Sequence, residues 1–335
     1  MSHTGIFRFF TIFFIAFMLA GLSACSKPSQ KSGDDKTAAG SRTPAEANAK
    51  AESAAAAPAA EVRVEDAGAG EKIKLRYQFK AGESVTARMD MKMSMKMDMG
   101  AGQAVAIDMP TIGMKMKIRT LDVLPGGNLK YEFVFDSVEV AHDAQLPDTA
   151  LESLKDALKS FEGTTGQAEV TPRGVTLKAD LQAPQNANPQ IRQMMDSLRQ
   201  QMNQMSVPFP EEPVGAGAHW TVTTRMQANG IAITNIYHYT LEKMENGVLE
   251  MKVSLEQKAD PQEIKSPGLP PGTVVKLMEM QSGGTGKIRT TLSQLIPESE
   301  VSSEIQMKMQ VQSGAQEQSL SQTMKLGVKM YPEQP

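Results

Sequence analysis

The chain has 335 residues, of which 40% are hydrophobic and 22% are charged, and its formal net charge is −3 at pH 7. This balance argues against a nucleic-acid binder, which needs a concentrated positive surface. Because the chain has a single cysteine, a disulfide framework and a cysteine-based zinc site are both excluded.

Residues 1–24 have the order of a secretory signal peptide. Arg8 precedes an apolar run, Phe9 to Leu22, that is too short to span a bilayer comfortably. The run ends in Leu22-Ser23-Ala24-Cys25, which resembles the lipobox of bacterial lipoproteins. The resemblance implies cleavage before Cys25 and a membrane partner reached through acyl chains such as palmitate. An ordinary signal peptide with an incidental cysteine is the alternative.

The resemblance also implies a place in the cell envelope. In Gram-negative lipoproteins an aspartate directly after the lipidated cysteine favours retention in the inner membrane, and this chain has Ser26 there. The expected location is therefore the outer membrane, with the protein facing the periplasm.

Residues 25–70 hold the cysteine and an Ala-rich segment in which Val62 and Val64 are the only larger aliphatic side chains. Such a composition cannot bury enough apolar surface to offset the entropy lost on ordering. We therefore expect a disordered tether that places the β-rich domain, residues 71–335, roughly 35–40 Å from the membrane.

From residue 72 onward, apolar and polar residues alternate. The pattern is most regular over residues 84–99, where the odd positions include Met89, Met91, Met93, Met95, Met97 and Met99. A period of two predicts antiparallel strands with one apolar and one polar face, and a strand of this length should bend around a core. The same alternation predicts strands at 73–79, 114–118, 129–135, 231–241, 249–255, 305–311 and 320–330.

Two helices are predicted to interrupt the strands and to cover the open face or mouth of the sheet. The first spans about 149–162, because Thr149 and Glu152 form a capping-box signature and Gly163 can end the helix. The second spans about 189–205 and begins at Asn188-Pro189, a cap residue followed by proline.

Short segments of the chain recur at an offset of 120 residues, which predicts an internal duplication. Thr120-Leu121-Asp122 matches Thr240-Leu241-Glu242, the apolar residues of 129–133 match those of 249–253, and Thr165-Gly166 matches Thr285-Gly286. Chance likeness between strands is the alternative. The predicted fold is mainly β: a long curved antiparallel sheet or half-barrel from two related units, about 72–182 and 218–330, joined by a helical connector, about 183–217.

No catalytic or metal-binding motif is present. His142, His219 and His238 match no metal-ligand spacing, and Gly283-Gly284-Thr285-Gly286 lacks the Lys-Ser/Thr of a phosphate loop. We interpret these glycines as strand-entry turns. The sequence predicts a protein that is not an enzyme and has no cofactor.

The methionines allow three interpretations. They can pack a core, because methionine fills irregular apolar space, or line a cavity for an apolar or lipid ligand. They can also bind Cu(I), which thioethers suit, although side chains about 6.6 Å apart cannot all share one ion. Core packing is favoured. The predicted protein is a non-enzymatic envelope lipoprotein with a binding or structural role. Its expected partner is an apolar ligand or an envelope protein. The alternative is a periplasmic protein that binds Cu(I).

One segment resembles a known family. Phe209-Pro210-Glu211-Glu212-Pro213-Val214-Gly215, followed by Gly217 and His219-Trp220-Thr221, is similar to the P-E-x-P-V-x-x-G-x-x-W-x segment of β-rich bacterial secreted proteins and lipoproteins of unknown function. The resemblance implies this fold over about 72–330 and no active-site residues. A more distant likeness, of fold alone, is to the LolA-like lipoprotein carriers, in which helices cover the concave face of a half-barrel.

Overall fold

The computed structural model describes residues 60–98, 100, 104–144, 146–182, 192, 195, 199, 208–228, 230–264, 272–313 and 316–333. Its strands, in chain order, are β1 (Glu61–Asp66), β2 (Ala69–Ile73), β3 (Ser84–Asp98), β4 (Ala104–Asp108), β5 (Ile112–Val123), β6 (Leu129–Val140), β7 (Thr165–Val170), β8 (Thr176–Gln182), β9 (Val214–Ala216), β10 (His219–Ala228), β11 (Ile231–Glu245), β12 (Val248–Lys258), β13 (Gln262–Ile264), β14 (Thr273–Thr291), β15 (Glu298–Ser313) and β16 (Gln316–Pro332). One helix, α2 (Asp148–Lys159), follows β6.

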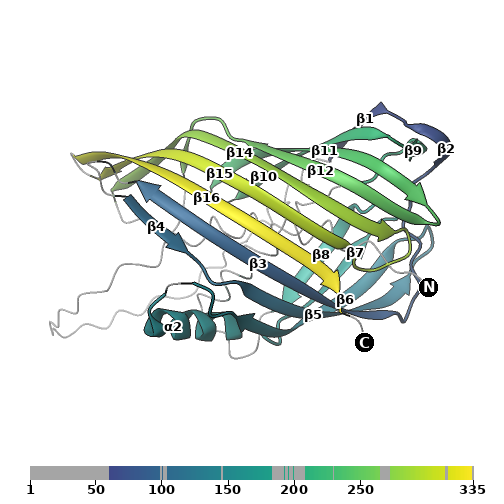
Figure 1. Cartoon of the computed structure of the whole chain (residues 1–335), viewed down its shortest axis with the longest axis horizontal. Coiled ribbons are helices and arrows are strands. Elements are labelled where there is room, and N and C mark those ends of the chain that lie inside the picture. The colour runs from purple at the N-terminus through teal and green to yellow at the C-terminus, as the bar shows by residue number, and fades with distance from the viewer. Residues whose placement is uncertain are drawn as a thin grey trace, which may run out of the picture.

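Nearly all strands join one antiparallel sheet of 14 strands. Its hydrogen-bonded order is β1-β10-β11-β12-β14-β15-β16-β3-β5-β6-β7-β8, with β13 paired to β14 and β4 paired to β3, while β2 and β9 form a separate pair. Figure 1 shows a strongly curved sheet, in which β7 and β8 pass behind β15 and β16. Since β1 and β8 end the order, the described strands form an open sheet. The prediction of a mainly β protein with one large antiparallel sheet is confirmed.

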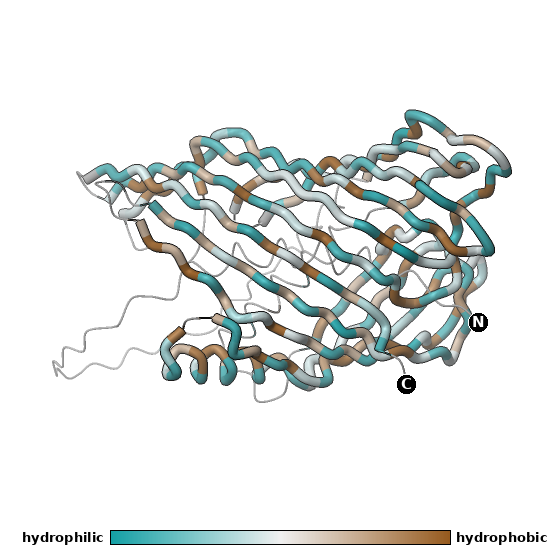
Figure 2. The backbone as a smooth tube through the Cα atoms, in the orientation of Figure 1, coloured by the Kyte–Doolittle hydropathy of each residue, from teal (hydrophilic) through white to brown (hydrophobic). Residues whose placement is uncertain are grey.

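Alternation along the strands divides the sheet into two faces. Figure 2 shows hydrophilic and hydrophobic residues following one another along most strands. The buried side chains of every long strand lie on one face, which we call the inner face; Met89 of β3, Tyr131 of β6 and Leu241 of β11 are at most 3% exposed there. The other, outer face carries the charged residues. All strands predicted between 84 and 330 are present.

Part of the predicted repeat is visible in the strand register. Three cross-strand pairs between β6 and β7 recur 120 positions later between β12 and β14: Leu129–Val170, Tyr131–Ala168 and Phe133–Gly166 correspond to Leu249–Thr290, Met251–Ile288 and Val253–Gly286. The offset fails by one residue in the preceding strands. Tyr131 pairs with Thr120, whereas Met251 pairs with Leu241 and not with Thr240, because each strand has a bulge at a different residue.

The boundary of the predicted tether is wrong by about ten residues. Residues 61–66 form β1, which pairs with β10 at the edge of the sheet and places Val64 opposite Trp220. Residues 69–73 form β2. If residues 26–60 alone act as a tether, its reach falls to roughly 30–35 Å. Residues 1–59, which include Cys25 and the predicted signal peptide, lie outside the described residues.

The helix predictions need correction. Among the described residues one helical element, α2, is complete where two were expected. Of the second, 189–205, only residues 192, 195 and 199 are described; these three are helical, and Met195 is 3% exposed. α2 begins at Asp148, with Pro147 at the N-cap and no side-chain cap bond, so the capping box at Thr149 is wrong. Glu152, its expected partner, pairs instead with Lys155 at 2.9 Å. Figure 1 places α2 at the lower rim of the sheet, and not across its inner face.

Two further local predictions are wrong. Residues 74–80 are extended but form no ladder, although Leu75, Tyr77 and Phe79 are buried as the alternation requires. The glycines at 283, 284 and 286 lie inside β14 and not in a turn. An added Cβ at Gly286 would come within 2.7 Å of Val301 Cγ2 and 2.8 Å of the Glu300 carbonyl oxygen, so glycine here permits close approach of β15.

Candidate functional site

The methionines of β3 lie on the inner face, and their burial falls along the strand. Met89 and Met91 are each 3% exposed, whereas Met93, Met95 and Met97 are half-buried. Met99 lies outside the described residues. The intervening Lys92 and Lys96 are exposed on the outer face, as the alternation predicts.

Neighbouring strands place further methionines beside those of β3. Met89 lies between Met330 of β16 and Met114 of β5, and Met95 pairs with Met324 of β16. Directly opposed residues in antiparallel strands have Cβ atoms about 4.5–5.5 Å apart. Around β3 the inner face therefore holds several unbranched, adaptable side chains on adjacent strands.

Polar side chains interrupt this apolar face, and several of them form one cross-strand row. Asn235 of β11 donates from Nδ2 to Thr224 Oγ1 at 3.3 Å, and Gln257 of β12 donates from Nε2 to Asn235 Oδ1 at 2.8 Å. Ser282 of β14 continues the row beside Gln257. On β16, Gln322 donates from Nε2 to the sulfur of Met95 at 3.0 Å.

Several of these polar atoms have no hydrogen-bond partner. The side-chain oxygens concerned, all buried, are those of Gln257, Ser282, Ser299, Ser303 and Gln322. Sequence analysis missed these residues, yet a signal was present: each of the glutamines stands at an apolar position of the alternation, Gln322 between Leu320 and Met324, and Gln257 two residues after Leu255.

The polar side chains that are fully buried among the described residues are all uncharged: they are threonine, serine, asparagine or glutamine. Burial raises the pKa of the Tyr131 and Tyr237 hydroxyls, and the neighbouring Tyr239 adds to the effect at Tyr237, so both remain neutral at ordinary pH. A ligand that reached these buried groups would meet uncharged hydrogen-bonding side chains beside the methionine thioethers.

Residues 74–80 and 208–213 fill one end of the inner face. The extended segment 74–80 is held between two turns: the Tyr77 amide donates to the Pro172 carbonyl at 2.7 Å, and the Gln78 amide donates to the Leu292 carbonyl at 2.8 Å. Tyr77 also packs on Phe209, with ring centroids 4.7 Å apart. Because β3 begins beside this segment, its buried methionines lie near the filled end.

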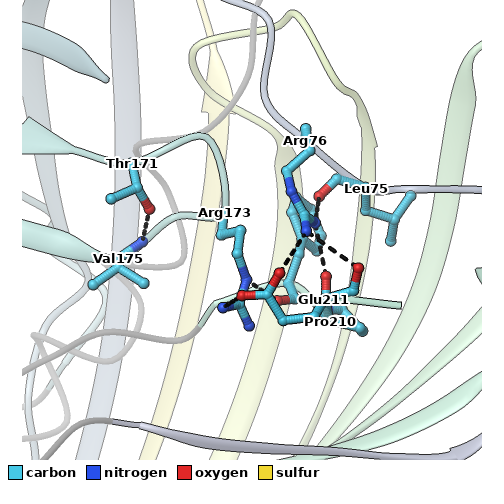
Figure 3. Close-up of polar contacts among 8 residues, drawn as sticks. Leu75, Arg76, Thr171, Arg173, Val175, Pro210 and Glu211 are labelled. Carbon is cyan, nitrogen blue, oxygen red and sulfur yellow. Dashed lines mark hydrogen bonds and ion pairs between the residues drawn. The ribbon is translucent and has the colours of Figure 1, made fainter. Parts of the chain in front are cut away.

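Glu211 links the segment 74–80 to the turn between β7 and β8 through ion pairs with Arg76 and Arg173 (Figure 3). Arg76 donates to the Pro210 carbonyl at 2.7 Å and its Nη2 lies 3.1 Å from Glu211 Oε2. Arg173, from the turn between β7 and β8, donates to the Phe209 carbonyl at 2.9 Å and pairs with the other carboxylate oxygen of Glu211. The proline- and glutamate-rich segment singled out in the sequence thus has a structural role.

The outer face holds open, solvated grooves. The groove over β12, β14, β15 and β16, about 960 Å³, is lined by Lys252, Lys287, Lys329 and Glu300. Lys329 and Glu300 form an ion pair of 3.1 Å between exposed side chains, which contributes little to stability. Its charged lining residues are four lysines, which include Lys92, and two acids, Asp90 and Glu300, so the groove has a small excess of positive charge.

Neither a metal centre of the usual ligands nor a membrane-spanning helix is found in the described part of the chain. No three His, Cys, Asp or Glu residues gather there in a way that could hold a metal ion. His219 and His238 each contact a threonine hydroxyl, at 2.9 Å from Thr240 and 3.1 Å from Thr221. No described helix has the length and apolar character needed to cross a bilayer.

Comparison with known proteins gives a family match over part of the chain. Residues 178–294 match a family of unknown function, DUF6263. The match contains the segment 209–221, on which the family resemblance rested, but is shorter than the expected 72–330. No curated protein matches the chain.

Two solved structures match the chain only weakly in sequence identity and in TM-score. The loop L8 deletion mutant of OmpT, an outer membrane protein of Vibrio cholerae, is 8% identical with a TM-score of 0.19, over 74% of this chain and 99% of its own. OccK1 (OpdK) of Pseudomonas aeruginosa is 8% identical with a TM-score of 0.18, over 75% of this chain and 99% of its own. TM-scores this low establish no common fold, and nothing below rests on them.

Proposed function

We propose that the chain is a non-enzymatic lipoprotein of the bacterial cell envelope, anchored through Cys25 to the periplasmic side of the outer membrane. In this proposal the inner face binds an apolar or lipid ligand at its methionine-rich end. The anchor rests on the lipobox, since a lone cysteine stands at the one position that lipidation requires.

The observation that carries the ligand proposal is the incomplete burial of the β3 methionines. A face that served packing alone would be covered along its whole length. Here Met93, Met95 and Met97 remain half-buried beside the fully buried Met324 and Leu326. Methionine-rich surfaces suit apolar ligands of variable shape because their side chains can repack.

A soft-metal site is the second candidate, and one observation favours it. Met330, Met89 and Met114 stand in one cross-strand row, so three thioethers lie on adjacent strands of one face. Thioethers are ligands that Cu(I) accepts. All three are at most 6% exposed, which suits packing equally well.

Replacing Met93 and Met95 with leucine should leave the inner face able to bind lipid. Leucine preserves approximate volume, so each change should cost less than about 1.5 kcal/mol. We expect lipid to co-purify with the native protein and, in similar amount, with the Met93→Leu/Met95→Leu variant. We expect added Cu(I) to leave the melting temperature of both unchanged. The measurements are mass spectrometry of gently extracted protein and thermal melting.

Lys92→Gln/Lys96→Gln is the matched control, because it changes the outer face of the same strand. Absence of any bound lipid in the native protein would contradict the ligand proposal. A rise in the melting temperature of the native protein with Cu(I) that a Met89→Leu/Met114→Leu variant lacks would favour the metal site over the lipid site.

Replacing Cys25 with alanine should release the protein from the membrane. The acyl chains each contribute about 0.8 kcal/mol per buried CH₂, and the variant cannot carry them. Cell fractionation and detergent partitioning should find the processed variant in the soluble periplasmic fraction and not in the membrane fraction. A variant that the signal peptidase cannot process should be found as an uncleaved precursor. Ser26→Ala is the control. Normal processing together with unchanged membrane attachment of Cys25→Ala would refute the lipid anchor.

A further inference from the structure

Three buried oxygens without partners lie close together on the inner face of β12, β14 and β15. They belong to Gln257, Ser282 and Ser303, and we call them the oxygen patch. Gln257 stands directly opposite Ser282, and Ser303 is the diagonal neighbour of Ser282, which pairs with Ile305. Direct neighbours have Cβ atoms about 4.5–5.5 Å apart and diagonal neighbours about 7–8 Å apart, so one small polar group can reach all three.

The orientation of the Gln257 amide is set by the fold. Its Nε2 donates to Asn235 Oδ1 at 2.8 Å, and Asn235 in turn donates to Thr224 Oγ1. The amide oxygen therefore remains as a fixed acceptor in a side chain that is 7% exposed. The two serine hydroxyls beside it can each donate and accept.

Leaving buried acceptors and hydroxyls unpaired is unfavourable, and native proteins nearly always supply a partner. Apolar residues would avoid the difficulty, and the same strands use them at adjacent inner-face positions, such as Leu255, Met280 and Ile305. The polar patch therefore points to a partner that comes from outside the fold.

The chemistry of the patch restricts that partner. Gln257 Oε1 can only accept, so the partner must donate a hydrogen bond, and the serines favour a group that also accepts. The described buried polar side chains are all uncharged, so a carboxylate or phosphate would find no opposite charge. A plain hydrocarbon or an ester would leave the Gln257 oxygen unpaired.

We infer that the inner face binds an uncharged amphiphile whose hydroxyl or amide group is held by Gln257, Ser282 and Ser303. Its acyl chain lies toward the half-buried methionines of β3, across Ile305 and Met324, which occupy the same cross-strand row as Gln257 and Ser282. This inference rests on the proposed function and adds the polar end of the ligand. Rotation of Met324 and of neighbouring unbranched side chains uncovers the patch when the ligand enters.

The test is a competition between three probes of equal chain length: monopalmitoylglycerol, methyl palmitate and sodium palmitate. The full, lipid-anchored chain in detergent is incubated with all three, and bound probe is read by native mass spectrometry. We expect the native protein to prefer monopalmitoylglycerol by tenfold or more, because a site built to pair a hydroxyl rejects analogues that cannot donate. The Ser282→Ala/Ser303→Ala variant should reduce that preference to under threefold.

Ser302→Ala is the matched control, since Ser302 is the exposed outer-face neighbour of Ser303 and should leave the preference unchanged. Without probe, the double variant should melt at the native temperature or above it, because it removes hydroxyls that have no partner. Gln257→Met should also lose the preference.

Each contrary result has a distinct meaning. Equal binding of the three probes by the native protein would overturn the polar recognition inferred here and leave the proposed function standing. Binding of none would overturn the proposed function itself. A double variant that melts several degrees lower would show that the serines are satisfied within the fold, for instance by buried water, and the inference would fall.

Discussion

Met91→Lys should prevent the protein from folding, whereas Met97→Lys should be tolerated. Met91 is 3% exposed and lies between Val328 and Ile112 on the inner face, so a lysine there would bury an unpaired charge. An uncompensated buried charge costs roughly 3–5 kcal/mol, a large part of the about 5–15 kcal/mol that stabilises a typical protein. At the half-buried Met97, a lysine can extend its ammonium group to solvent.

Urea unfolding of both variants measures how the cost of a lysine falls from Met91 to Met97. Lys92→Gln is the control on the outer face. We expect Met91→Lys to be insoluble or unfolded without denaturant, Met97→Lys to lose no more than about 1 kcal/mol, and the control to match the native protein. Equal tolerance of lysine at Met91 and Met97 would mean that the inner face is not a core.

Gly286→Ala should destabilise the protein, and Gly283→Ala on the same strand should not. At Gly286 an added methyl would meet Val301 Cγ2 at 2.7 Å, the Glu300 carbonyl oxygen at 2.8 Å and Val253 Cγ1 at 3.1 Å. One of these contacts is backbone, so β15 itself must shift, and overpacking of this kind costs roughly 1–3 kcal/mol. At Gly283 a Cβ would meet nothing within 4 Å.

The measurement is the midpoint of thermal or urea unfolding for the two alanine variants. Gly283→Ala should equal the native protein or gain about 0.4–1 kcal/mol, because alanine reduces the entropy of the unfolded chain. If the two variants behaved alike, the close approach of β14 and β15 at Gly286 would not be a constraint on the sequence.

The strands were predictable because their signal is local. In β3, alternate side chains point to opposite faces, so the odd positions from Val85 to Met97 had to share one face whatever they packed against. In β1 the same signal was too short to use: only Val62 and Val64 alternate with its charged residues. The backbone of β10, more than 150 positions later, supplies the ladder that orders it. Local composition cannot report a partner that distant.

The predicted start of the first helix was wrong for a different reason. The Thr149–Glu152 spacing fits a capping box, but Pro147 already sets the extended conformation at the entrance, with φ −56° and ψ 142°. The helix therefore begins one residue earlier, and the Thr149 carbonyl accepts a hydrogen bond from Ser153 Oγ at 2.8 Å. The position of the helix start therefore follows from Pro147 and not from the Thr149–Glu152 motif.

The candidate site was predictable in its apolar half only. Alternation identified the methionine face, because a core surface and a ligand surface share that pattern. The oxygen patch depends on the register of three strands, which places Ser282 opposite Gln257 and beside Ser303. Register across strands far apart in sequence follows from tertiary pairing, so sequence spacing gave no means of bringing these oxygens together.

The pairing of β3 with β16 also determines when the protein can fold. Tyr331 of β16 donates to Asp90 of β3 at 3.0 Å across a sequence separation of 241 residues, and the methionine strand lies between β16 and β5. A chain exported with its amino end first would present β3 to the periplasm long before β16 emerged. Such distant contacts slow folding, and an unpaired strand of alternating methionines is prone to aggregation. Under the proposed periplasmic location, the protein should depend on chaperones that hold β3 apart from other chains until β16 has emerged.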